Sequence, residues 1–381
     1  MILARVLSAF AKPALAGGIV AAAATGGWFA IDRFHHDSPT PFAQALDAGP
    51  RLVISEFGPY SDTIVAVNPD DVGDRTTIAT VEHAANFGVF PVLSPDGAAI
   101  AWTGLPAQTA NPSPDAPATL GVITADGGTQ ALADDVDLVV PPVWAPDSQS
   151  VLARKSTTDA DGSPRFDLLR LGRDGSRATL TTWTTAALFP VGFSPDGATV
   201  YFTTLNASGS DLYRIGADAT GEALVAHLAD DITRDWKLSP DGGTLAFTDA
   251  VGGAQPRTVA RVLDLASGAI ADAPDPGDGS SQLAPAFAED GTLAIGALRP
   301  QGGGTAVEVH GDGSASTLTD TGADIDLPIA WSPDGSKLAV RSVEDATSYS
   351  AGPSHIDLVD AAGGRARVSD GADTLVVGWM R

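Results

Sequence analysis

The sequence predicts an all-β fold, a ring of seven four-stranded blades known as a β-propeller, on three observations. A turn motif recurs six times at blade-sized intervals, and a second series of aspartates recurs in phase with it. The composition agrees, because 42 glycines and 27 prolines favour many short strands joined by tight turns. Sequence motifs that recur at such intervals are typical of propellers and other repeat architectures.

The first repeated feature is an apolar residue followed by Ser-Pro-Asp-Gly or a close variant, from Leu93 to Gly97 in the first copy. Proline presets φ for a turn, aspartate bonds nearby backbone N–H groups, and glycine permits the exit. Each copy therefore predicts a hairpin turn, and an alternating strand follows it. We interpret the six aspartates as structural turn residues and not as catalytic carboxylates: Asp96, Asp147, Asp196, Asp241, Asp290 and Asp334.

The second feature is an alternating strand that ends in aspartate, as in Leu120–Thr124 before Asp126 and Ile356–Val359 before Asp360. We expect these to be third strands that turn into fourth strands, so each repeat supplies one blade. The full series lies at Asp126, Asp174, Asp218, Asp264, Asp312 and Asp360.

The two ends of the repeat region are expected to complete one blade together. Residues 51–55, 63–67 and 76–81 match the second, third and fourth strands of a blade that lacks its first strand. Trp379 occupies the place of the apolar residue before the next turn motif, as Trp331 does one repeat earlier. The C-terminal strand is therefore predicted to join the N-terminal blade and close the ring, which removes two open edges.

The Trp/Phe-Ser-Pro-Asp-Gly turn with its apolar strand resembles the repeat of TolB-like, WD-repeat-like propellers, over residues 51–381. The resemblance implies a scaffold, a periplasmic binding module or the non-catalytic domain of a peptidase. A count of seven departs from TolB, which resembles a six-bladed ring, and weakens any transfer of its partner contacts.

The N-terminal region predicts export. Residues 1–34 are interpreted as a signal-anchor or a signal peptide, because Arg5 and Lys12 precede an uncharged stretch from Ala14 to Ile31. An anchor predicts a single-pass protein of the cell membrane with its propeller on the periplasmic or extracellular side. Cleavage before Thr25 would make the chain secreted. Residues 35–50 are expected to be a spacer with one short helical turn around residues 42–46.

Charge and composition exclude several functions. The net charge of −25 argues against nucleic-acid binding because phosphates would be repelled. The absence of cysteine excludes disulfides and thiolate zinc sites. No nucleophile elbow, His-Glu-x-x-His or phosphate loop is found, and the histidines at 83, 227, 310 and 355 fall in different repeats. We therefore expect no enzyme and no cofactor, unless a divalent cation such as calcium binds.

Four loops that join a fourth strand to the next first strand are rich in aspartate, with Asp134 and Asp230 among them. Such loops share one face of a propeller, so they would focus negative potential on one mouth of the channel. The candidate metal ligands are Asp135, Asp137, Asp231, Asp324, Asp326 and Asp373. The simpler alternative is that these are turn formers on a soluble surface.

The predicted function is a membrane-tethered scaffold of the cell envelope that binds an envelope protein or a cationic peptide. The alternative is a propeller enzyme, a hydrolase or lyase that acts on envelope polysaccharide or peptide.

Overall fold

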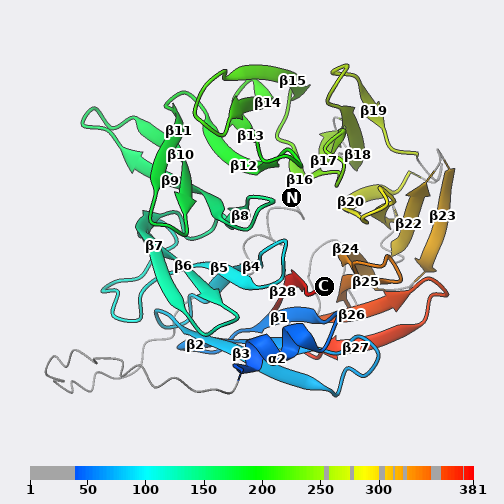
Figure 1. Cartoon of the computed structure of the whole chain (residues 1–381). Helices are drawn as coiled ribbons and strands as arrows, with labels where there is room; N and C mark the ends of the chain where they lie inside the picture. The colour runs from blue at the N-terminus through cyan, green and yellow to red at the C-terminus, as the bar shows by residue number, and fades with distance from the viewer. Residues whose placement is uncertain are drawn as a thin grey trace, which may run out of the picture.

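The described residues form a ring of seven four-stranded antiparallel sheets, seen along its axis in the computed structural model of Figure 1. The structure describes residues 39–252, 257–274, 279–299, 305–311, 314–320, 324–344, 353–371 and 373–381. The predicted signal-anchor at 1–34 lies outside these ranges. Within them, no helix has the length and apolar character needed to cross a membrane.

Each sheet is one blade, and we number the blades along the chain from the one that holds both termini of the ring. Blade 1 contains β28 (Thr374–Trp379), β1 (Leu52–Glu56), β2 (Ser61–Val67) and β3 (Arg75–Glu82). Blade 2 contains β4 (Val89–Leu93), β5 (Ala99–Gly104), β6 (Ala118–Thr124) and β7 (Thr129–Val136). Blade 3 contains β8 (Val143–Trp144), β9 (Ser150–Thr158), β10 (Pro164–Gly172) and β11 (Arg177–Trp183).

The remaining blades follow the same order from the innermost strand outward. Blade 4 contains β12 (Ala187–Phe193), β13 (Thr199–Asn206), β14 (Gly209–Gly216) and β15 (Ala223–Ala229). Blade 5 contains β16 (Arg234–Leu238), β17 (Thr244–Val251), β18 (Arg257–Asp264) and β19 (Ile270–Asp272). Blade 6 contains β20 (Ser281–Phe287), β21 (Leu293–Leu298), β22 (Thr305–Gly311) and β23 (Ser314–Asp320). Blade 7 contains β24 (Ile325–Trp331), β25 (Lys337–Val343), β26 (Ser354–Asp360) and β27 (Arg365–Ser369).

The core of the protein lies between blades. Seven clusters of buried apolar side chains are found among the described residues, and each cluster joins two neighbouring blades. The cluster between blades 4 and 5, for example, includes Leu212 and Phe247, both fully buried. Every blade thus covers an apolar face of the next, which is why such repeats are stable only as a stack.

The C-terminal strand closes the ring as the sequence predicts. Strand β28 is the innermost strand of blade 1 and pairs antiparallel with β1, so that Trp379 lies opposite Leu52 and Thr374 opposite Glu56. The predicted all-β propeller of four-stranded blades, with the last strand joining the first sheet, is therefore confirmed.

The repeated turns share one local structure. Gly97, Gly197, Gly242, Gly291 and Gly335 all have positive φ, between 67° and 87°, a region that glycine enters without steric cost. At the corresponding position of blade 3, Ser148 has φ of 58°. Its hydroxyl accepts a hydrogen bond from the backbone N–H of Asp96 in the preceding blade at 3.2 Å, a contact that glycine could not make.

The apolar residue of the motif connects consecutive blades where it is tryptophan. Trp144, Trp331 and Trp379 each donate the indole N–H to a backbone carbonyl of the preceding blade's innermost strand. The acceptors are Val92 at 3.0 Å, Ala286 at 3.2 Å and Ala330 at 3.3 Å. We call these three bonds the indole latches.

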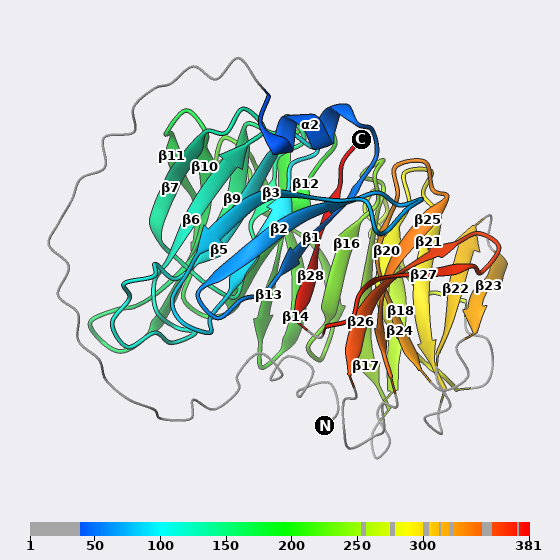
Figure 2. The same ribbon diagram turned by 90° about the horizontal axis from the view of Figure 1, so that it is seen from below.

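One helix is found in the described chain, α2 (Pro41–Asp47), where the sequence predicts a helical turn. Thr40 caps it by accepting a hydrogen bond from the Ala43 N–H at 3.1 Å. Phe42 and Ala45 are buried against blades 1 and 2 and the C-terminal Met380. Figure 2 shows α2 and the C-terminus on the same side of the ring.

Candidate functional site

The predicted acidic residues do not form one cluster. Asp135 lies on the outer strand β7, where its carboxylate pairs with Lys155 Nζ at 2.6 Å and Arg177 Nη1 at 2.8 Å. These bases hold the pKa of Asp135 at about 2, chiefly through the hydrogen bond from Arg177. Asp137 binds Arg154 and the Ser156 N–H at 2.8 Å.

The other candidates lie elsewhere in the ring. Asp231 accepts from the N–H of Ile232 at 2.8 Å, beside blade 5. Asp326 is fully buried on β24 and pairs with Arg365. Asp324 and Asp373 line two separate grooves, one between blades 6 and 7 and one between blades 7 and 1. Among the residues that the structure describes, no group of three or more His, Asp or Glu side chains is arranged to hold a metal ion.

Three of the candidate ligands, Asp135, Asp137 and Asp326, are therefore not free carboxylates, and cation binding by the acidic loops stays a prediction. Each carboxylate is bound by a basic side chain that comes from a different strand. Lys155 and Arg154 lie on β9, and the partner of Asp326 lies on β27. An acidic run in a sequence predicts local negative potential only when such partners are absent.

The turn aspartates lie in the hairpins between first and second strands. The Asp334 carboxylate accepts from the Ser332 hydroxyl at 2.6 Å and from the Ser336 N–H at 3.0 Å, and these bonds lower its pKa to about 2. The same Asp-to-backbone bond, at 2.9–3.0 Å, occurs at Asp96, Asp147, Asp196, Asp241 and Asp290.

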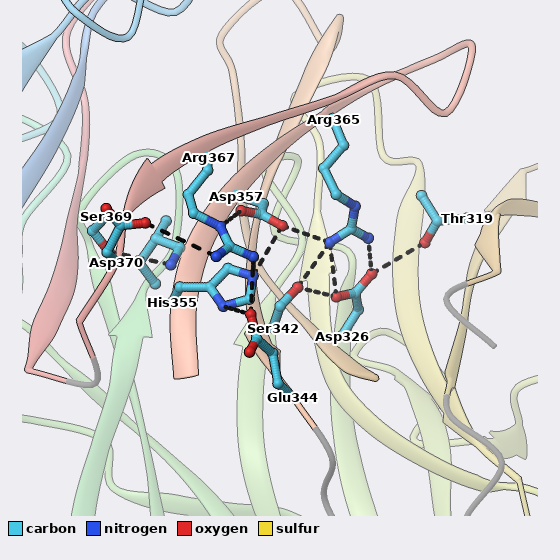
Figure 3. A network of polar contacts seen from close by, with 11 residues as sticks. Thr319, Asp326, Ser342, Glu344, His355, Asp357, Arg365, Arg367, Ser369 and Asp370 are labelled. Atoms are coloured by element: carbon cyan, nitrogen blue, oxygen red, sulfur yellow. Dashed lines mark hydrogen bonds and ion pairs between the residues drawn. The ribbon is translucent and has the colours of Figure 1, made fainter. Parts of the chain in front are cut away.

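A network of polar side chains lies on blade 7, and Figure 3 shows it from close by. Arg365 joins two buried carboxylates, with Nη1 at 2.7 Å from Asp357 Oδ2 and a further ion pair to Asp326. Its Nη1 also donates to the Ser342 hydroxyl at 2.8 Å. Two buried charges of the same sign thus share one guanidinium, an arrangement that is stable only while the cation remains.

The cluster continues through Arg367 and His355 (Figure 3). Arg367 Nη2 lies 3.0 Å from Glu344 Oε1 and 2.8 Å from the His355 Nε2 atom. His355 is itself 3.2 Å from Asp357 Oδ2 and 3.3 Å from Glu344 Oε1. Asp357 Oδ1 is buried and has no hydrogen-bond partner, although Arg367 Nε lies 3.6 Å away.

Two grooves flank the outer strand β27. The first groove, of about 330 Å³, is lined by Leu318, Thr319, Asp324, His355, Asp357, Gly363, Arg365 and Arg367. The second groove, of about 420 Å³, is lined by Glu56, Phe57, Arg75, Val368, Ser369, Asp370, Gly371, Asp373 and Thr374. Both volumes fall in the range of small-ligand and side-chain pockets, ~300–1,000 Å³.

Sequence reasoning missed the arginines of this cluster. Arg365 and Arg367 are two residues apart on β27, and alternate residues of a strand share one face. Opposite them on β26, Asp357 pairs in register with Arg367. The available signal was the Arg-Ala-Arg-Val alternation of β27, which follows a third strand, β26, that contains aspartate.

The comparisons with known proteins give the fold alone. No protein-family model matches the chain, and no curated protein matches it in sequence. Among solved structures, a prolyl endopeptidase is similar over 88% of this chain and 53% of its own, with 15% identity and a TM-score of 0.59. The chain thus spans about half the length of that peptidase.

Two further structures are similar over most of their own length. The β-propeller domain of the trilobed protease from Pyrococcus furiosus is covered over 94%, and this chain over 84%, with 13% identity and a TM-score of 0.54. TolB from Acinetobacter baumannii is covered over 81%, and this chain over 86%, with 17% identity and a TM-score of 0.47. The chain is a β-propeller distantly similar to these proteins in structure.

Proposed function

We propose that this chain is an exported seven-bladed β-propeller that acts as a binding scaffold in the cell envelope, tethered through residues 1–34. Its partner is a protein with an exposed basic segment, which docks in the second groove beside β27. The observation that carries this proposal is the chemistry of that groove, where an aromatic ring and several carboxylates surround one space.

Three acidic side chains line the second groove, Glu56, Asp370 and Asp373, against one base, Arg75. Arg75 pairs with Glu56 and neutralises its charge. Asp370 and Asp373 then have no basic partner among the lining residues. Asp370 is almost fully exposed, at 91%, and its nearest ion-pair contact is Arg367 Nη1 at 3.9 Å. Asp373 lies close enough to the Arg341 guanidinium for their charges to interact, so a cation brought to this place would meet one weakly compensated carboxylate, Asp370, beside one that is shared.

Phe57 gives the groove a second means of binding a cation. Its ring is 38% exposed and stacks on the buried His83 ring, with centroids 5.7 Å apart. A guanidinium or ammonium over an aromatic face gains about 0.5–1 kcal/mol at exposed sites. Carboxylates beside such a ring favour a basic side chain over an uncharged one.

The network beneath the grooves supports binding more than catalysis. A general base needs a ring nitrogen free to reach the substrate proton, whereas both nitrogens of His355 contact carboxylates. The enzymatic alternative, a hydrolase or lyase, would have to use the first groove after His355 has been released from these contacts.

Binding of a labelled Arg/Lys-rich peptide, followed by fluorescence anisotropy, tests the proposal. The variant Asp370→Asn/Asp373→Asn should bind at least about tenfold more weakly, since each hydrogen bond to a charged group contributes about 1.5–3 kcal/mol. The matched control is Asp115→Asn/Asp159→Asn, which removes the same charge from exposed loops of other blades. Equal weakening in both variants would mean general attraction to an acidic surface and would reject the groove.

The location is tested separately. A reporter fused to the C-terminus of the full chain should be accessible to protease added outside the cytoplasmic membrane, and it should stay with the membrane fraction if residues 1–34 are retained. A protected reporter would contradict export without bearing on the peptide measurement.

A further inference from the structure

The innermost strand of blade 5 differs from the other six. The innermost strands β28, β4, β8, β12, β20 and β24 have no basic residue, and Asp326 is their single charged one. Strand β16, Arg-Asp-Trp-Lys-Leu, carries two basic residues, Arg234 and Lys237. They are the basic residues that the described structure places on an innermost strand.

These two cations form no ion pair within the part of the chain that the structure describes. Neither Arg234 nor Lys237 makes an ion pair or a side-chain hydrogen bond to another described residue. By contrast, the other two described lysines both do, Lys155 with Asp135 at 2.6 Å and Lys337 with Asp70 at 2.7 Å. In a chain with 47 acidic and 22 basic residues, acids are abundant, so two neighbouring bases without one are unusual.

A β-bulge places the two side chains differently from a regular strand. Arg234 lies opposite Thr248 and Lys237 opposite Ala246, so three steps on β16 face two steps on β17. The intervening Asp235 has a positive φ of 56°, an uncommon conformation for a residue other than glycine. Bulges of this kind re-aim side chains and are frequent beside functional sites.

The surroundings of Lys237 suit an anion. Its side chain is exposed, yet the ring around it removes part of its hydration and lowers its pKa. The one acid close enough to act on it is Asp235, whose carboxylate already accepts a hydrogen bond from the Thr248 hydroxyl at 3.0 Å. A cation that has lost hydration and lacks a salt bridge is stabilised by a bound oxyanion.

We propose that Arg234 and Lys237 form an anion-binding site on the innermost strand of blade 5 that takes a carboxylate group of a small acidic ligand. This site is distinct from the grooves of blade 7, and it does not depend on the function proposed for them. Because the protein as a whole is strongly negative, its general field repels anions. Saturable binding of an anion therefore requires a local site.

Isothermal titration of the full chain with citrate and with inorganic phosphate, at constant ionic strength, tests the site. We expect saturable citrate binding that Lys237→Gln weakens at least about tenfold, the effect of losing a hydrogen bond to a charged group. The matched control is Arg214→Gln, which removes one exposed positive charge from β14. We expect this control to bind citrate within about twofold of the parent, since a distant exposed charge is screened by salt.

A second measurement locates the ligand. Citrate should slow the acetylation of Lys237, followed by mass spectrometry, and should leave the rates at Lys155 and Lys337 unchanged. The proposal is overturned by an absence of saturable citrate binding, by equal losses in the two variants, by binding of phosphate without citrate, or by equal protection of all three lysines.

Discussion

Removal of the last seven residues, Leu375–Arg381, should destabilise the whole ring. The cut deletes nearly all of β28 and the two residues after it, and with them the buried side chains of Val377 and Met380, which are 6% and 0% exposed. Burial of each such side chain contributes about 1.5–3 kcal/mol, so these two contribute roughly 3–6 kcal/mol together. The indole latch of Trp379 to Ala330 adds about 0.5–1.5 kcal/mol.

This loss is comparable with the stability of an entire domain, about 5–15 kcal/mol. The truncation also exposes the edge of β1 and the apolar side of blade 7 that β28 covers. We therefore expect the truncated chain to be largely unfolded or aggregated at 25 °C, although it keeps the other six blades intact in sequence.

Urea unfolding followed by circular dichroism provides the assay. Met380→Ala is the graded variant and should cost about 2–5 kcal/mol, as large-to-small core substitutions do. Deletion of Arg381 alone is the control, because its exposed ion pair with Glu289 contributes about 0–1 kcal/mol. A seven-residue truncation that unfolds at the same urea concentration as this control would refute the closure of the ring through β28.

Three further outcomes follow from the contacts described above. Arg365→Ala should cost about 3–5 kcal/mol in urea unfolding, because Asp326 and Asp357 would be left buried without their cation; a cost below 1 kcal/mol would contradict that arrangement. The pKa of Asp135 is about 2 against an ordinary 3.8, so its contribution is complete above pH 3.8 and is lost as the pH falls through about 2. Asp135→Asn should accordingly flatten the fall in melting temperature over that range, and an unchanged slope would count against the ion pairs. Trp144→Phe should cost about 0.5–1.5 kcal/mol for its indole latch, measured by the same urea titration, whereas an unchanged midpoint would mean that the latch contributes nothing.

The repeat made the fold predictable. Turn motifs such as Ser332–Gly335 act through local backbone chemistry. Each copy therefore predicts a turn from its own residues, independently of the other repeats. The position of Trp379 in the repeat was enough to predict which strand closes the ring, because the missing partner could only come from the other end of the chain.

The polar sites could not be predicted in the same way, because their members come from different blades or strands. The bases that bind Asp135 lie 20 and 42 residues away, and no local pattern assigns them. Lys237 could have been identified from the sequence. It directly precedes the apolar residue of the turn motif, a position where other copies have Val92, Val143 or Ala330. A position-by-position comparison of the repeats identifies such a departure, whereas a search for catalytic motifs does not.

The indole latches are distributed unevenly around the ring, which divides the propeller into an arc with latches and an arc without them. The latches fasten blade 3 to blade 2, blade 7 to blade 6 and blade 1 to blade 7. The motif residues of blades 4, 5 and 6 are Phe193, Leu238 and Phe287, whose side chains have no N–H to donate. Blade 2, with Leu93, is instead held by α2.

Blades 4 to 6 are joined to the blades before them by apolar contact and by other hydrogen bonds. Arg154 Nη1 donates to the Leu188 carbonyl at 3.1 Å, the Thr233 N–H to the Ser210 hydroxyl at 2.8 Å, and the Ala260 N–H to Gln282 Oε1 at 3.0 Å. Strand β16 lies in the middle of this arc. The two arcs therefore resist the sliding of one blade against the next by different contacts, the indole bond in one arc and bonds from arginine, serine and glutamine side chains in the other.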